Sequence, residues 1–174
     1  MELHYLRVYE SVSGGWVDLH PLHGTDELPD NLEACKLLAQ KGYRLQLLPC
    51  LNQEALELRQ KLLPEVFGNK NPDVRINNKA IADIKKPNNR EATKTSVKNA
   101  IYRAAQQRVE IVIINLHQAS YSFSDIKEAL LSTLRIGRNS SIREAWIITH
   151  DNNVLIIPKK MINTKSFYAV LNCL

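Results

Sequence analysis

Apolar residues recur along this chain in two periods, which predict helices and strands. Apolar residues three and four positions apart predict helices at 27–41, 52–64, 97–105 and 124–136. Alternating or continuous apolar runs predict one or two strands within 1–20, then strands at 43–48, 73–76, 80–85, 111–116, 145–149 and 154–157. This order predicts an α/β fold with a mixed central sheet flanked by helices.

Turn and capping residues set the expected ends of these elements. Asp26 is the candidate N-cap of the first helix and Gly42 its stop. Asn77-Asn78 predicts a tight turn between two paired strands. Thr95 or Ser96 is expected to cap the third helix, after a break in the pattern at 87–89.

No internal repeat or linker interrupts the 174 residues. We therefore expect one structural domain, in which 1–26 forms strands and a loop that pack on a core at 27–174. No apolar run is long enough to cross a membrane. The first residues lack the basic and apolar regions of a secretory signal, so none is expected.

The three cysteines, Cys35, Cys50 and Cys173, are widely spaced and include no Cys-x-x-Cys pair. This spacing predicts neither a disulfide framework nor a structural zinc site. Cys35 lies within the apolar stripe of the first helix, and we expect it to be a small buried side chain.

Positive charge is concentrated in one part of the chain. Residues 70–108 contain ten basic and three acidic residues, a net charge of +7, whereas the remainder contains 13 basic and 15 acidic residues. Such a basic segment suits a polyanionic partner, because lysine and arginine bind phosphates. A solvated polar stretch between core elements would show the same composition.

The acids inside this basic segment are the main candidates for chemistry. Asp73 precedes the strand at 73–76, and Asp83-Ile84-Lys85 ends the strand at 80–85. Strand alternation places Asp83 and Lys85 on one face. Two converging carboxylates can hold a divalent ion, and a nearby ammonium can stabilise charge on a phosphate. A purely structural hairpin would show the same alternation.

Pro72-Asp73 followed by Asp83-Ile84-Lys85, on a hairpin between two helix–strand units, resembles the PD-(D/E)XK nucleases. The wider sequence is similar to the tRNA-cleaving toxin domains at the C-termini of contact-dependent growth inhibition proteins. The resembling segments include 31–42, 47–49, 71–73, 82–87 and 111–116, and together they cover roughly 27–157.

This resemblance implies a PD-(D/E)XK core and a metal-dependent endonuclease, with tRNA favoured over DNA. Mg²⁺ or Mn²⁺ would be held by Asp73, Asp83 and the main-chain carbonyl of Ile84, and Lys85 would orient water or stabilise the phosphorane. Gln107 would position a phosphate or water. Such a toxin would act in the cytoplasm of a target cell, and an immunity protein would protect the producing cell.

An acid from the first helix also joins the metal site in the PD-(D/E)XK pattern. Helical geometry directs Glu33 away from the apolar stripe and places Glu27 and Asp30 on or beside the inward face. We favour Asp30, which directly precedes Asn31, with Glu27 as the alternative.

Five cations near the motif are expected to bind flanking phosphates: Lys86, Arg90, Lys94, Lys98 and Arg103.

Two other functions remain open from the sequence. A metal-independent ribonuclease of the barnase or colicin kind could pair Lys85 with a histidine, and the candidates are His20, His23, His117 and His150. A non-catalytic nucleic-acid-binding module is the third possibility. It has few aromatic residues for base stacking, and Tyr102 is almost alone within the basic segment.

Overall fold

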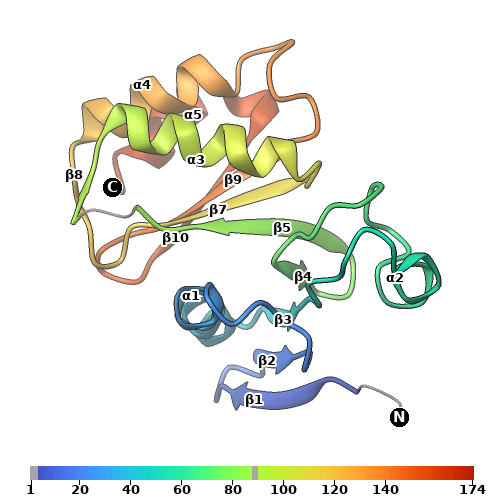
Figure 1. Ribbon diagram of the computed structural model, residues 1–174. Helices are drawn as coiled ribbons and strands as arrows, with labels where there is room; N and C mark the ends of the chain where they lie inside the picture. Colours follow the sequence, from blue (N-terminus) through green and yellow to red (C-terminus); the bar gives the residue numbers. More distant parts are fainter. Residues whose placement is uncertain (1–3, 88–89) are drawn as a thin grey trace. The chain divides into compact units, whose positions relative to one another are not determined.

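Strands and helices alternate along most of the chain in the computed structural model, which describes residues 4–87 and 90–174 (Figure 1). Contacts divide the chain into two units, Met1–Asp83 and Ile84–Leu174. The division falls inside a strand, between Asp83 and Ile84. Residues 1–3 of the expected N-terminal strands, and Asn88 and Asn89 of the expected break, lie outside the described residues.

The first unit is built on neighbouring strands in the order β1-β2-β3-β4-β5. Their bounds are Leu6–Glu10, Trp16–Leu19, Arg44–Leu47, Val74–Ile76 and Ala80–Lys85, of which Ile84 and Lys85 belong to the second unit. β2 and β3 are parallel and the other three pairs are antiparallel. The parallel pair needs a crossover connection, which helix α1 supplies.

Helix α1, Leu28–Gln40, buries one side of its surface in the first unit, including Cys35 as expected. Its N-cap is Glu27, without a side-chain capping bond, so the expectation for Asp26 is wrong. Pro29 is tolerated because it lies in the first turn. Gly15 packs so closely against the end of α1 that an added Cβ would lie 2.1 Å from the main-chain oxygen of Ala39.

Helix α2, Leu56–Leu62, is shorter than the expected 52–64. Arg59 of this helix is a buried side chain that donates hydrogen bonds to the main-chain carbonyls of the segments before and after it. These acceptors are the carbonyls of Leu51, Asn52, Asn69 and Lys70, together with the side-chain oxygen of Asn71. The Asn52 carbonyl also accepts from the Ala55 N–H at 3.2 Å, so the chain forms a turn before α2 begins.

The turn between β4 and β5 follows the expectation from Asn77-Asn78. Both asparagines have positive φ, 50° and 58°, and the Lys79 N–H donates to the Ile76 carbonyl at 3.0 Å, so a type I′ turn lies within the three-residue connection 77–79. The strands pair Val74 with Ala82 and Ile76 with Ala80.

The second unit contains neighbouring strands β7, β9 and β10, at Ile111–Asn115, Glu144–Ile148 and Val154–Pro158. β7 and β9 are parallel, and β9 and β10 are antiparallel. Every residue of β7 is buried, as its continuous apolar run predicts. With parallel and antiparallel pairs and flanking helices, the expected α/β fold class is confirmed.

Three α-helices accompany these strands: α3 at Lys94–Gln106, α4 at Phe123–Thr133 and α5 at Lys165–Leu171. Helices α3 and α4 lie side by side (Figure 1), and α3 also contacts β7. Thr93 caps α3 by accepting a hydrogen bond from the Ser96 N–H, so the helix begins before the expected Thr95 or Ser96. Ser122 caps α4, two residues before the expected start.

The sequence does not predict the short elements of the fold, which are strands β6 (Glu91–Ala92) and β8 (Ser120–Tyr121), the 3₁₀ turn η1 (Lys159–Met161), and α5. Two-residue strands show no period, so the sequence carries no signal for them. None of the helices formed by residues 4–87 and 90–174 combines the length and apolar character needed to span a bilayer.

Candidate functional site

The hairpin of β4 and β5 sets the positions of the two candidate aspartates. Val74 pairs with Ala82, so one step further along this antiparallel register Asp73 faces Asp83. Both side chains are almost fully buried, with exposed fractions of 4% and 1%. The register thus places the two aspartates opposite one another within the first unit.

The main chain at Asp73 is held by a series of buried hydrogen bonds. The N–H of Leu48, just after β3, donates to the Asp73 carbonyl at 2.9 Å. His23 Nδ1 lies 2.6 Å from the Leu48 carbonyl and therefore carries the proton of that bond. His23 Nε2 then accepts from Asn31 Nδ2 of α1 at 3.2 Å. This series ties Asp73 to α1.

Cys35 connects the buried face of α1 to Asp73 by electrostatics. Burial raises the pKa of the Cys35 thiol well above its usual range, and the negative charge of Asp73 raises it further. The thiol is therefore an uncharged, unreactive neighbour of the site rather than a nucleophile.

The acids of α1 are placed differently from the expectation. Glu27 and Asp30 are exposed, whereas Glu33, expected to point outward, is partly buried. The expected order of burial is therefore wrong, because the buried stripe of α1 centres on Asn31, Cys35 and Leu38. Asp30 is one residue before Asn31, about 100° around the helix from it.

Asp73 and Asp83 are the site residues that could hold a metal ion. Among residues 4–87 and 90–174, no group of three or more His, Cys, Asp or Glu side chains is placed to hold a metal ion. Asp73 and Asp83 still provide hard oxygen donors. They suit Mg²⁺ because proteins often bind it through one or two carboxylates, with water and phosphate completing its shell.

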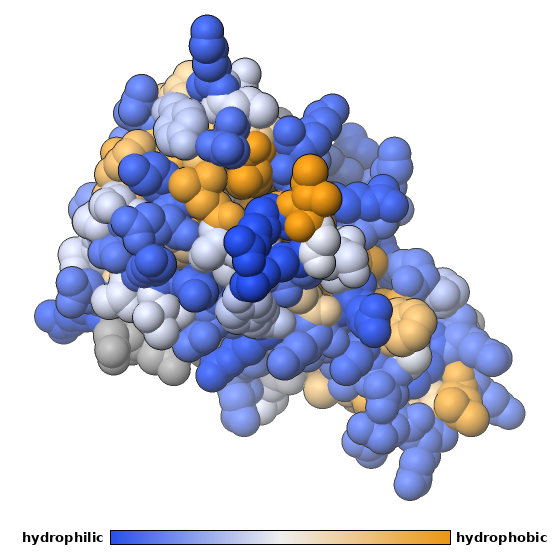
Figure 2. All heavy atoms as spheres, turned by 90° about the horizontal axis from the view of Figure 1, so that it is seen from above, coloured by the Kyte–Doolittle hydropathy of each residue, from blue (hydrophilic) through white to orange (hydrophobic). Residues whose placement is uncertain are grey.

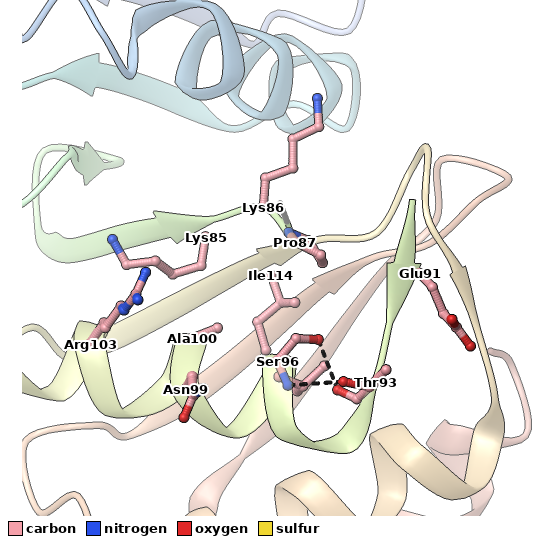
Figure 3. A pocket seen from close by; sticks show the side chains of 11 residues that line it. Lys85, Lys86, Pro87, Glu91, Thr93, Ser96, Asn99, Ala100, Arg103 and Ile114 are labelled. Carbon is pink, nitrogen blue, oxygen red and sulfur yellow. Dashed lines mark hydrogen bonds between the residues drawn. The ribbon is translucent and has the colours of Figure 1, made fainter. Parts of the chain in front are cut away.

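Lys85 lies in the second unit, where it lines a pocket of about 280 Å³ between β5 and α3. Lys85 and Arg103 extend from opposite walls toward the same end of this pocket (Figure 3). Lys86 also lines it but points the other way, as strand alternation requires. The remaining polar lining residues are Glu91, Thr93, Ser96 and Asn99.

The other expected cations do not line this pocket. Lys94 is paired with Glu128 of α4 at 2.6 Å, and this hydrogen bond lowers the pKa of the Glu128 carboxyl. Arg90 is exposed and Lys98 is partly buried. The structure thus gathers Lys85, Lys86 and Arg103 and leaves the rest of the set elsewhere.

Gln107 is the C-cap residue of α3. It is partly buried, whereas Gln106 is exposed, which is the order of burial expected from the helical stripe.

The histidines fall into two groups. His20 and His23 are buried in the first unit, and His20 Nδ1 accepts from the Leu22 N–H. In the second unit the rings of His117 and His150 are 6.4 Å apart, and His117 Nδ1 donates to the His150 carbonyl at 3.2 Å. His150 is exposed and His117 partly buried.

Residues 70–154 match the model of the contact-dependent growth inhibition CdiA C-terminal domain family. The matched segment covers 85 of the 174 residues. It contains Asp73, Asp83, Lys85 and Gln107, and it excludes α1. No curated protein matches the chain.

A solved CdiA C-terminal toxin, from the toxin and immunity complex of Burkholderia pseudomallei, has a similar fold. The TM-score is 0.51 at 23% sequence identity, with 79% of this chain and 91% of the toxin chain covered. At this identity the similarity shows a shared fold, and it extends beyond the segment that matches the CdiA family.

Sequence analysis missed several residues around these sites. The sequence indicates His23 only as a candidate base, and its link from Asn31 to Leu48 joins segments distant in sequence. Asn99 could have been found, because it is four residues before Arg103 and therefore lies on the same face of α3.

Proposed function

We propose that this chain is the toxin domain of a contact-dependent growth inhibition system and that it cleaves RNA, with tRNA favoured over DNA. The observation that carries the proposal is the pair of buried aspartates, Asp73 and Asp83, with Lys85 two positions further along β5. Strand alternation gives Asp83 and Lys85 a common face. This is the residue pattern of a PD-(D/E)XK nuclease.

The two aspartates would hold Mg²⁺ or Mn²⁺, with the Ile84 carbonyl as a further ligand. The ion would polarise the scissile phosphate and lower the pKa of a bound water. The hairpin would hold the two aspartates in place before substrate arrives, so little ordering would be needed on binding. Asp30, or Glu27 in its place, would add the acid from α1.

Lys85 would stabilise charge on the phosphate, and Arg103 would bind a phosphate beside it in the same pocket. Lys86, Arg90, Lys94 and Lys98 would contribute to the wider positive potential, and Gln107 would position a phosphate or water. Lys94 should contribute least, because Glu128 offsets its charge.

The decisive experiment compares total tRNA with plasmid DNA, each incubated with the protein in Mg²⁺, Mn²⁺ or EDTA. We expect tRNA cleavage that requires the metal and is lost in Asp73→Asn and Asp83→Asn. Asp26→Asn is the matched control, because it removes an exposed carboxylate just before α1. Wild-type cleavage by Asp83→Asn would contradict the proposed site, and equal cleavage of DNA would contradict the substrate.

A toxin of this kind requires an immunity protein, and the structural neighbour comes from a toxin and immunity complex. We expect the partner to present an acidic surface, because residues 70–108 carry a net charge of +7. The toxin would act in the cytoplasm of the target cell. Expression of wild type should arrest growth and expression of Asp83→Asn should not; growth arrest by both would contradict a nuclease toxin.

A metal-independent ribonuclease is the second candidate, favoured by the adjacent His117 and His150 in the second unit. Such an enzyme would use a histidine as general base at the 2′-hydroxyl. Cleavage that persists in EDTA and is lost in His117→Ala or His150→Ala would establish this mechanism. His20 and His23 are weaker candidates because both are buried. Salt-sensitive binding without any cleavage would indicate a binding module.

A further inference from the structure

A second pocket lies at the C-terminal end of α3, beside the loop 134–143 that follows α4. Its volume is about 470 Å³, and it shares no lining residue with the Lys85 pocket. Tyr102, Gln106 and Arg108 line it from α3 and its end, and Asn139, Ser140 and Ser141 line it from the loop. It combines one aromatic ring with amide and hydroxyl groups.

The loop side of this pocket is held in place by hydrogen bonds. Asn139 Nδ2 donates to the Thr133 carbonyl at 2.9 Å, and Lys159 Nζ donates to the Asn139 carbonyl at 3.0 Å. Arg138 Nη1 lies 3.5 Å from the Tyr102 hydroxyl, to which it donates. These contacts fix the loop opposite the tyrosine, so a ligand would meet a formed surface.

The surroundings are strongly positive. Residues 100–109 and 134–143 contain five arginines and no aspartate or glutamate. The nearest acids in sequence are Glu110 and Glu144, and Glu144 accepts a hydrogen bond from the Trp146 indole at 2.7 Å. Polar side chains cover most of the molecular face in Figure 2. Arginine suits nucleic acids because its guanidinium binds phosphates in a bidentate way and stacks on bases.

Arg108 has a backbone conformation that favours glycine. It directly follows the C-cap of α3 with a φ of 59°, in the left-handed region. A glycine would adopt this conformation more easily and end the helix equally well. The arginine therefore costs the fold some stability, and its side chain lines the pocket.

We propose that this pocket binds an unpaired nucleobase of an RNA. Tyr102 stacks on the base, Gln106 and the serine hydroxyls contact its edge, and Arg108 and Arg138 bind the flanking phosphates. An acidic protein would engage the arginines but would have no need of the aromatic pocket. The inference rests on the proposed function, since the RNA is taken to be its substrate.

The test measures binding without cleavage, using the full chain in EDTA. The probes are fluorescently labelled total tRNA and a blunt double-stranded RNA of similar length, followed by anisotropy. Tyr102→Ala should weaken tRNA binding roughly 5- to 30-fold and change duplex binding less than about twofold. Tyr168→Ala, which removes an exposed tyrosine of α5, is the matched control and should bind like wild type.

Arg108→Gly separates folding from binding. The variant should unfold at the same or a higher temperature than wild type. It should bind tRNA about fivefold more weakly, and the slope of the logarithm of its association constant against the logarithm of salt concentration should become smaller in magnitude by about 1. Unchanged tRNA binding by both variants would overturn the inference, as would equal losses on tRNA and duplex. If they instead weaken only poly-glutamate binding, the surface serves an acidic protein.

Failure of this inference is distinguishable from failure of the nuclease proposal. Cleavage by Asp83→Asn would remove the proposed catalytic site without affecting the binding result in EDTA. Absence of tRNA binding by the wild-type protein would overturn the pocket assignment directly.

Discussion

The two units of the chain differ in where they keep their charged and titratable groups. The first unit buries His20, His23, Arg59, Asp73 and Asp83, whereas the buried polar residues described in the second unit are neutral. The second unit instead displays its cations around two pockets. Under the proposed function, the groups that hold the metal would be fixed in a core, and the groups that attract a polyanion would stay in contact with solvent.

The largest expected effect comes from the buried aspartates. Asp73→Asn or Asp83→Asn should reduce cleavage at least about 10³-fold, because a single carboxylate holds a divalent ion poorly. Each variant should still unfold cooperatively in EDTA, since asparagine has nearly the same shape as aspartate. Initial rates and thermal unfolding measure the two effects. A loss of activity with a large loss of stability would contradict this interpretation.

The thiols offer the next test of burial in the first unit. Cys35 is buried and has a raised pKa, whereas Cys50 and Cys173 are exposed. Under native conditions the Cys50 and Cys173 thiols should react readily with an aromatic disulfide reagent. The Cys35 thiol should react at least about 10³-fold more slowly, because the reagent reaches it only when the fold opens. All three should react in denaturant. Rapid native reaction of three thiols would show that α1 is not packed as described.

Arg59 is expected to dominate the stability of its loop. Arg59→Lys keeps the positive charge but loses the planar guanidinium that donates to five acceptors. This variant should lower the free energy of unfolding by about 2–3 kcal/mol. Arg143→Lys, on the exposed surface of the second unit, should change it by less than about 0.5 kcal/mol. Urea titrations measure the free energy of unfolding of both variants. Similar losses in the two variants would contradict the expected difference between the units.

His20 should make the stability of the protein depend on pH. Burial, with a smaller contribution from His23, lowers the pKa of His20 below its usual 6.5. The unfolded chain therefore takes up a proton at higher pH than the folded one, and stability should fall as the pH drops below about 6.5. His20→Asn should show a smaller loss between pH 7 and pH 5. An equal pH dependence in both proteins would exclude His20 as its source.

The smallest effect concerns a cation of the second unit. Lys94→Ala should change tRNA affinity less than about twofold, because Lys94 is already paired with Glu128. Arg103→Ala, which removes a pocket cation from the same helix, should weaken binding by more. A larger loss of tRNA affinity in Lys94→Ala than in Arg103→Ala would contradict this expectation. It would show that a cation's contribution does not depend on its position in the pocket.

Local chemistry made part of this structure predictable. Asn77-Asn78 predicts the hairpin turn, and the turn then fixes the register that sets Asp73 opposite Asp83. The apolar run at 111–116 likewise predicts the buried strand β7. Each of these features depends on a few neighbouring residues, which is the information that a single sequence contains.

Features that depend on distant contacts were missed. Arg59 of α2 binds carbonyls on both sides of its helix, and the bond between His23 and Asn31 joins a loop to α1. The burial of Asp30 and Glu33 was misjudged because a helical repeat describes angles around one helix and not what packs against it.

Arg59 has a further consequence for how the first unit moves. One guanidinium holds carbonyls at both ends of the segment 51–71, so these ends cannot detach separately without leaving a buried donor unsatisfied. The segment should therefore open as one cooperative unit, and its protected amide hydrogens should exchange with deuterium together rather than in sequence from the tip of the loop.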